Sequence, residues 1–211
     1  MSAEPVVQGS DAWRQARVGV VTASRISDVM AKGKGTTRAN YLAQIVAERL
    51  SGESCEDVFE TAAMRRGSEQ EPFARIAYEV HSGQMIDQVG LVMHPTIPGA
   101  GGSPDGLVGT GGGVEIKCPN TSTFIGYVMK DEVPSKYQDQ MFWNMACSGR
   151  EWWDFAAFDK RLPPEMRLFV KRLPRDDDYI AELEAGVIRF LAEVDETIAA
   201  LRSAGALRSA L

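Results

Sequence analysis

The sequence predicts an α/β or α+β fold in which helices flank a central β-sheet. Three observations support this prediction. Segments with helical periodicity occupy both ends of the chain, short apolar runs separated by glycine and proline occupy its middle, and one long apolar stripe marks the last helix. Helices that enclose a block of strands usually form layers around one core. We therefore expect a single domain over residues 1–211.

The N-terminal part, residues 10–83, is expected to be helical. Thr22 is a suitable N-cap for a short helix over 22–31, and a second helix over 37–52 ends at Gly52. A third helix ends at Gly83 and has an apolar stripe with the spacing i, i+3, i+4, i+7, which we expect to face the core. The stripe consists of Phe73, Ile76, Ala77 and Val80.

Residues 84–172 are expected to form the sheet and two further helices. Strands are predicted within 85–95, 100–109, 112–119, 151–159 and 166–174, and helices over 121–130 and 135–149. A last helix over 176–202 starts behind the acidic residues Asp176 to Asp178. Its apolar stripe consists of Ile180, Leu183, Val187, Phe190, Leu191, Val194, Ile198 and Leu201.

The composition is that of a globular protein and excludes several classes. Of the 211 residues, 44% are hydrophobic and 25% are charged. No apolar run is long enough to span a bilayer and no signal-peptide pattern is present, so we expect a soluble intracellular protein. Three widely separated cysteines and two histidines predict neither a disulfide framework nor a Cys/His metal site. Any catalysis must therefore use carboxylates and lysine.

The net charge of −6 argues against a protein that simply coats nucleic acid. A local basic groove is nevertheless compatible with an acidic chain. Charge alone does not decide the partner.

The stretch SPDGLVGTGGGVEIKCP, residues 103–119, contains the strongest candidate site. Side chains alternate along a strand, so Glu115 and Lys117 share one face while Val114 and Ile116 point to the other, apolar face. Asp105 precedes the loop that returns the chain, and hairpin geometry would place its carboxylate opposite Glu115. Two neighbouring carboxylates repel one another unless a cation lies between them.

This residue set suits Mg²⁺, which prefers oxygen ligands and uses one or two carboxylates with water and substrate phosphate. The backbone carbonyl of Ile116 is a further candidate ligand. Lys117 beside the metal would orient or deprotonate the attacking water, because a lysine near cations and away from bulk solvent has a lowered pKa. The chemistry indicated is metal-assisted phosphodiester hydrolysis.

A structural interpretation of the same residues stays open at this point. Glu115 and Lys117 are equally consistent with the solvated side of an amphipathic strand, and Asp105-Gly106 with an ordinary turn. The spacing D-x(9)-E-x-K by itself occurs in many unrelated chains.

Four motifs, in the same order along the chain, resemble one known family. SPDGL followed by EIKCP resembles the PD-(D/E)XK nuclease core, in particular that of the phage-lambda-type exonucleases, the YqaJ-like viral recombinase family. The remaining segments are WRQARVGVVTAS at 13–24, RGSEQEPFAR at 66–75 and YQDQMFWNM at 137–145. The resemblance covers residues 13 to 160. It implies a restriction-endonuclease-like core with a central mixed sheet flanked by helices.

The resemblance implies catalytic and metal-binding roles for four residues. Asp105, Glu115 and Lys117 match the metal-binding and water-activating positions, and Glu71 matches a helix glutamate that reaches the metal. For Glu71, an S-x-x-E capping box from Ser68 at a helix start, disturbed by Pro72, is the alternative. Periodicity favours burial of Glu69 instead, whereas the family register favours Glu71 as the metal-region glutamate.

The resemblance also implies DNA contacts. Arg17 and Ser24 match the family's pocket for the 5′-phosphate, where a guanidinium can bind two phosphate oxygens and a hydroxyl can join backbone N–H groups. Ser103 and Gln140 match further polar contacts near the active site. For each, an ordinary surface, turn or helix position is the alternative. Lys32 and Lys34 are candidates for backbone contacts, or for a solvated loop.

The implied function is a Mg²⁺-dependent deoxyribonuclease, with Mn²⁺ as the alternative metal. It would bind the ends of double-stranded DNA and digest the 5′-phosphorylated strand from 5′ to 3′, leaving mononucleotides and a 3′ single strand. The family further implies a ring-shaped homotrimer, a single-strand-annealing recombinase partner, no membrane, and a phage or prophage gene expressed in the bacterial cytoplasm. The rival hypotheses are an endonuclease of the same core and a catalytically silent DNA-binding module.

Overall fold

The computed structural model describes residues 8–32, 35–55 and 61–209, without the side chains of 62–64 and 206–209. Helices precede and follow the main block of strands as the sequence predicts, but one short strand, at 21–22, lies in the N-terminal region that is expected to be helical. Lys34, a candidate DNA contact, lies outside the described residues. Among the described residues, no helix is long and apolar enough to cross a membrane.

The N-terminal region is built from short helices around one short strand. In chain order its elements are α1 (Asp11–Ala16), β1 (Val21–Thr22), the 3₁₀ helix η1 (Ala23–Arg25), α2 (Ile26–Met30) and α3 (Thr37–Ser51). The predicted end of α3 is confirmed, because Gly52 caps it in the left-handed conformation with a φ of 74°. The predicted helix over 22–31 is shorter than expected. Thr22 stands at its start, but its side chain makes no capping hydrogen bond.

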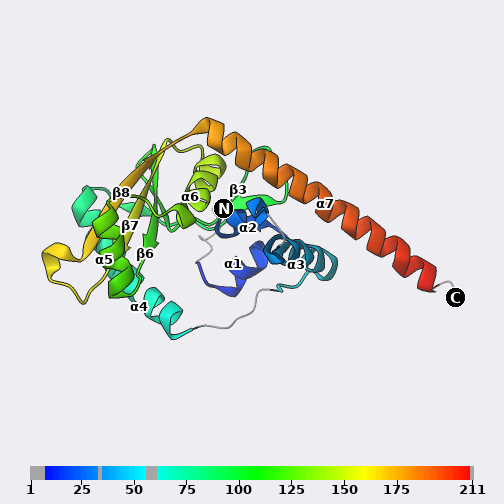
Figure 1. Ribbon diagram of the computed structural model, residues 1–211, viewed down its shortest axis with the longest axis horizontal. Helices are drawn as coiled ribbons and strands as arrows, with labels where there is room; N and C mark the ends of the chain where they lie inside the picture. The colour runs from blue at the N-terminus through cyan, green and yellow to red at the C-terminus, as the bar shows by residue number, and fades with distance from the viewer. Residues whose placement is uncertain (1–7, 33–34, 56–60, 210–211) are drawn as a thin grey trace, which may run out of the picture.

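Two sheets form the centre of the molecule (Figure 1). The smaller has the order β1-β4-β3 and the larger β2-β5-β6-β7-β8. The larger is mixed, since β6 and β7 are parallel while its other pairs are antiparallel. The strands are β2 (Ile86–Asp87), β3 (Val92–Met93), β4 (Ala100–Gly102), β5 (Gly106–Val108), β6 (Gly112–Lys117), β7 (Trp152–Phe158) and β8 (Leu168–Pro174). A mixed sheet flanked by helices confirms the predicted fold class.

Helices cover both faces of the larger sheet. On one face, α4 (Ala62–Ser82) packs through Ala74 and Tyr78 against Val114 and Ile116 of β6. On the other face lie α5 (Thr121–Lys130) and α6 (Ser135–Ser148), and α6 joins the two sheets through the largest apolar cluster of the structure. The side chains of β6 therefore divide between two cores. This division confirms the predicted alternation.

The last helix, α7 (Asp177–Ser209), extends away from the rest of the molecule (Figure 1). Its first part packs on the core through the predicted stripe, from Ile180 to Val194, and Ile198 is partly buried. Leu201 is 50% exposed, so the predicted stripe ends before it. The helix also continues past the predicted end at residue 202.

The predicted apolar stripe of α4 is wrong except at Ala77, which is partly buried against the core. Phe73, Ile76 and Val80 are at least half exposed, whereas Gln70, Ala74 and Tyr78 are buried. The helix also begins earlier than expected and runs through Pro72. The buried residues recur every four positions, at Gln70, Ala74 and Tyr78. This face is rotated by about one residue from the stripe predicted from hydropathy.

Gly113 is required by the packing of two adjacent strands. A Cβ at this position would lie 2.3 Å from Cη2 of Trp153, which is fully buried in β7. Replacing Gly113 with alanine is expected to lower the free energy of unfolding by about 1–3 kcal/mol, because the Trp153 ring must shift within a packed core. Urea denaturation measures this change.

Gly111→Ala is the matched control for that variant. A Cβ at Gly111 would meet Trp152 Nε1 at 3.5 Å, an ordinary contact. Equal stability of the two variants would contradict the packing argument.

Candidate active site

The hairpin of β5 and β6 places Asp105 beside Glu115. The antiparallel ladder pairs Gly106 with Val114, so Asp105 and Glu115 are the next positions along it. The Asp105 carboxylate is held there by Oδ2, which accepts a hydrogen bond of 2.7 Å from the Ile116 N–H. Both carboxylates therefore lie at the same end of the hairpin, as the sequence predicts.

Glu115 is fully buried between the sheet and α6. Its Oε1 accepts hydrogen bonds from Lys117 Nζ and, at 2.7 Å, from Gln140 Nε2. Its Oε2 is buried and has no hydrogen-bond partner among the described residues. The interpretation of Glu115 as a solvated residue is therefore wrong. Burial, reinforced by Asp105, raises the pKa of Glu115 to about 7, although Lys117 and Gln140 oppose this rise.

Lys117 differs from the sequence-based expectation of a lowered pKa. Burial alone lowers the pKa of Lys117, but the carboxylates of Glu115 and Asp105 outweigh burial and raise it. Its ammonium also lies 5.3 Å from the centre of the Tyr137 ring. In this structure Lys117 is therefore protonated and paired with Glu115, and it cannot accept a proton as a general base.

Glu71 approaches this centre from α4. Burial and the nearby Asp105 raise the pKa of Glu71, and Arg75 and Lys117 lower it. Its Oε1 accepts a hydrogen bond of 2.7 Å from Arg75. Glu69 is exposed, which contradicts the burial that periodicity suggests for it. The capping box is also wrong, because α4 starts at Ala62 and Ser68 lies inside the helix.

The donor set fits a divalent cation. Among the described residues, no three Asp, Glu, His or Cys side chains converge on one point, since Glu71 is turned to Arg75. Asp105 and Glu115 nevertheless supply two carboxylates, and the buried Glu115 Oε2 accepts no hydrogen bond from the described residues. In an antiparallel strand the N–H and C=O of one residue point to the same side, so the Ile116 carbonyl faces the Asp105 side as well. Mg²⁺ commonly takes such a small set and completes its shell with water and phosphate.

Arg17 lies beside Ser103, whereas the resemblance groups Arg17 with Ser24 and Ser103 with Gln140. Arg17 Nη1 donates a hydrogen bond of 3.3 Å to Ser103 Oγ, and Nη2 donates one of 3.3 Å to Thr22 Oγ1. The guanidinium is stacked 4.2 Å from the centre of the Trp13 ring. Ser103 lies two residues before Asp105, so this group adjoins the carboxylates. Ser24 is exposed on the 3₁₀ turn, and no hydrogen bond brings it to Arg17.

Sequence reasoning missed the residues that fix Arg17. Glu48 is 3% exposed in α3, and its Oε2 accepts a hydrogen bond of 2.8 Å from the Gly19 N–H. Its Oε1 accepts another of 3.1 Å from the Cys55 N–H. Glu48 thus holds the loop behind Arg17, while Thr22 and Trp13 hold its guanidinium. Glu48 and Gly19 lie 29 residues apart along the chain, so no local sequence pattern could have revealed their hydrogen bond.

A family model described as the YqaJ-like viral recombinase domain matches residues 12–151. The chain belongs to the YqaJ-like viral recombinase family. This match spans most of the elements described above, from α1 to the start of β7. It includes Arg17, Glu71, Asp105, Glu115 and Lys117. No curated protein sequence matches the chain.

Solved structures similar to this family member are exonucleases. One is LHK-Exo in complex with dAMP, with 47% identity, a TM-score of 0.88 and coverage of 94% of this chain and 100% of that chain. Another is the alkaline exonuclease LHK-Exo from Laribacter hongkongensis, with 46% identity, a TM-score of 0.87 and coverage of 93% and 98%. A phage-related exonuclease from Haemophilus somnus 129PT has 14% identity and a TM-score of 0.66 over 86% and 96%, which shows the shared fold.

The raised pKa of Glu115 predicts a pH dependence of stability in metal-free buffer. The unfolded chain ionises this carboxyl near its ordinary pKa of 4.5, whereas the folded protein keeps the proton until about pH 7. The folded state binds more protons in this window, so the stability that Glu115 contributes falls as pH rises through it. Urea denaturation in EDTA at pH 5 and pH 8 should show wild type losing stability relative to Glu115→Gln. Parallel pH profiles of the two proteins would contradict this.

Proposed function

We propose that this chain is a metal-dependent exodeoxyribonuclease that digests the 5′-phosphorylated strand of linear double-stranded DNA from 5′ to 3′. One observation supports the chemistry most directly. A fully buried glutamate, Glu115, has one carboxylate oxygen without a partner and lies beside Asp105 and Lys117. Two neighbouring buried carboxylates with a single ammonium between them carry excess negative charge, and a divalent cation between the two groups would offset the repulsion. The similarity to LHK-Exo supports the reaction class.

The metal site would consist of Asp105, Glu115 and the Ile116 carbonyl, with Glu71 adjacent. A bound Mg²⁺ or Mn²⁺ supplies Lewis-acid polarisation of the phosphoryl oxygens and activation of water. The residues of the chain then have distinct roles. Gln140 orients Glu115 through the hydrogen bond to Oε1. Protonated Lys117 donates to a phosphoryl oxygen and stabilises the negative charge that develops there.

The polarity of digestion rests on the Arg17 group. A guanidinium held by Trp13, Thr22 and Ser103 is oriented to bind phosphate oxygens in pairs. Because Ser103 is two residues from Asp105, a 5′-phosphate at Arg17 would place the first phosphodiester near the carboxylates. Ser24 is exposed near the start of α2 and is proposed as a further contact.

The biological setting is proposed from the family. The products would be mononucleotides and a 3′ single strand for phage-type recombination, handed to a single-strand-annealing partner. A homotrimeric ring would retain the DNA by topology, which suits a chain with a net charge of −6. The enzyme would act in the cytoplasm of a bacterium that carries the phage or prophage.

Arg17→Ala is expected to abolish a preference for 5′-phosphate. The test compares release of acid-soluble nucleotide from linear duplexes with 5′-phosphate and 5′-hydroxyl ends. The wild type should favour the phosphate end, and the variant should digest both ends at the slower rate, since a charged hydrogen bond contributes about 1.5–3 kcal/mol, or about 10- to 100-fold. Arg150→Ala, which removes a guanidinium bound to the Gly109 carbonyl, is the control. An unchanged preference in Arg17→Ala would contradict the assignment.

Assays on linear and circular DNA distinguish the exonuclease from the two rival functions, an endonuclease and a silent binding module. Covalently closed circular DNA should remain intact with an end-dependent exonuclease and should be cut by an endonuclease of the same core. A catalytically silent binding module would release no nucleotide from either substrate in Mg²⁺ or Mn²⁺. That last result would overturn the enzymatic proposal.

A further inference from the structure

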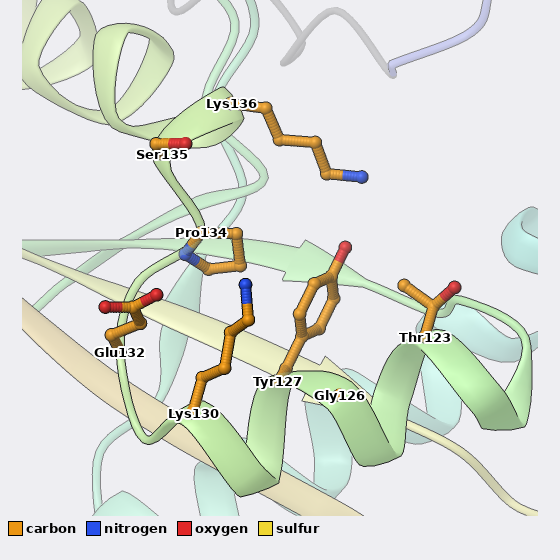
Figure 2. Close-up of a pocket in the computed structure, with 8 residues that line it drawn as sticks. All are labelled: Thr123, Gly126, Tyr127, Lys130, Glu132, Pro134, Ser135 and Lys136. Atoms are coloured by element: carbon orange, nitrogen blue, oxygen red, sulfur yellow. The ribbon is translucent and has the colours of Figure 1, made fainter.

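A pocket of about 360 Å³ lies between α5 and the start of α6, apart from the carboxylate centre. We call it the Tyr127 pocket; its lining includes Thr123, Tyr127, Lys130, Glu132, Ser135 and Lys136. Figure 2 shows the Tyr127 hydroxyl and the ammonium groups of Lys130 and Lys136 directed into the space between the two helices. Three groups that donate hydrogen bonds thus share one cavity.

The Tyr127 hydroxyl makes no well-formed hydrogen bond within the fold. The side chain is 8% exposed, and among the described residues no group meets the buried hydroxyl oxygen in hydrogen-bond geometry, although the Tyr137 hydroxyl and the Lys136 ammonium lie close to it. The ring is fixed by edge contacts with Tyr137 and Phe155, whose centroids lie 6.5 Å and 5.4 Å away. Buried polar groups are nearly always satisfied in native proteins. An unsatisfied phenol aimed into a cavity therefore indicates a ligand that accepts a hydrogen bond.

The start of α6 adds a second, independent preference for an acceptor. This 14-residue helix has Pro134 at its N-cap, no side-chain capping bond and no acidic residue in its first turn. Ser135 and Lys136, whose N–H groups would normally be capped, line the pocket, whereas the Tyr137 N–H donates to the Pro134 carbonyl at 2.9 Å. The first turn instead carries Lys136, whose charge opposes the positive end of the helix dipole. The start of α6 thus lacks a capping side chain and an acidic residue, and it carries a lysine instead. Such a helix start is suited to binding an external anion.

Tyr137 connects this pocket with the active site. Lys136 Nζ lies 4.7 Å from the centre of its ring and Lys117 Nζ lies 5.3 Å from the same centre. The two ammonium nitrogens are therefore no more than about 10 Å apart, the sum of those two distances. Successive phosphates of one DNA strand advance about 3.4 Å along the helix axis. A DNA strand with one phosphate at Lys117 would thus have another phosphate, no more than about three nucleotides away, at Lys136.

We propose that the Tyr127 pocket binds a phosphodiester group of the DNA strand within about three nucleotides of the scissile bond. The inference rests on the proposed nuclease function. The Tyr127 hydroxyl, the first N–H groups of α6 and Lys136 donate to the phosphate oxygens, and Lys130 adds charge from the end of α5. Glu132, the acidic residue of the lining, lies on the far side of Pro134 from Lys136 (Figure 2).

The test measures binding of a fluorescent 5′-phosphorylated duplex in EDTA, by anisotropy over a range of salt concentrations. Tyr127→Phe should weaken binding about 3- to 10-fold at one salt concentration, the loss of a neutral hydrogen bond, with an unchanged salt dependence. Lys136→Gln should reduce the slope of log Kobs against log salt by about 0.7–0.9, the loss of one phosphate contact. Lys171→Gln, an exposed lysine paired with Asp131 at 2.9 Å, is the matched control and should bind within twofold of wild type.

Thermal unfolding without DNA provides the second readout. Because the Tyr127 hydroxyl makes no well-formed hydrogen bond to the described residues, Tyr127→Phe should keep or raise Tm while it weakens DNA binding. A lowered Tm would show that the hydroxyl is bonded within the protein, and would overturn the inference.

Competition with inorganic phosphate and with dAMP distinguishes the sources of the anion. Unchanged duplex binding in both pocket variants would overturn the inference. If the variants bind duplex normally and only the competition by phosphate or dAMP weakens, the pocket binds free anions, and the inference is overturned as well. Digestion of linear duplex by the wild type is assayed in parallel. If the wild type digests DNA while the variants bind normally, only the inference fails. If the wild type digests nothing, the proposed function fails.

Discussion

Glu115→Gln is expected to reduce nucleotide release from linear duplex DNA by about 1000-fold or more. The substitution keeps the shape of the side chain and an oxygen that accepts from Lys117 and Gln140, but it removes one of the two negative charges that face the proposed cation. Loss of Lewis-acid stabilisation of several kcal/mol corresponds to a rate effect of this size. The assay is release of acid-soluble nucleotide in saturating Mg²⁺.

Calorimetric titration with Mg²⁺ and Mn²⁺ tests the cause of that loss. Wild type should bind the metal, and Glu115→Gln should bind it far more weakly, because a single carboxylate remains. The variant should also stay folded and, in EDTA at pH 8, should be more stable than wild type. Glu165→Gln, an exposed glutamate in η2 (Pro164–Met166), should match wild type in every assay. Activity of Glu115→Gln within tenfold of wild type would refute the proposed metal site.

Lys117→Met is expected to lower kcat by about 100- to 10,000-fold, the range for a group that stabilises charge or transfers a proton in the transition state. Methionine keeps an unbranched apolar stem in the same space but lacks the ammonium. Both carboxylates remain, so Mg²⁺ binding should persist at alkaline pH. The loss of activity should therefore exceed any loss of metal affinity.

The pH dependence of metal binding separates this effect from that of Glu115→Gln. The charge of Lys117 lowers the pKa of Glu115, so its removal should raise that pKa further. Protons then compete with Mg²⁺ at higher pH, and metal affinity should fall more steeply toward neutral pH in the variant. Lys171→Met controls for the loss of a surface lysine. If kcat and the pH profile of Mg²⁺ binding both matched wild type, Lys117 would have no role in the reaction.

Much of the fold could be predicted from local patterns. Alternation along β6 correctly divided its side chains between two faces, because the pleat fixes side-chain direction independently of the rest of the chain. Glycine at position 52 correctly ended α3, because only the αL conformation completes that turn without strain. The stripe of α4 was wrong, since hydropathy cannot tell which of two adjacent faces meets the sheet. The buried face includes a polar residue, Gln70, and leaves Phe73 exposed.

The sequence by itself determined the residue types and order of the site: Asp105, Glu115 and Lys117 within one hairpin, where short separation along the chain makes proximity a matter of strand geometry. Tertiary structure decided the burial and the hydrogen-bond partners of those residues, and therefore the pKa of Glu115 and of Lys117. The full burial of Glu115, its hydrogen bond from Gln140 and the contact of Arg17 with Ser103 all depend on segments distant in sequence. Electrostatic environment is a sum over spatial neighbours, and the packing of helices on the sheet alone selects those neighbours.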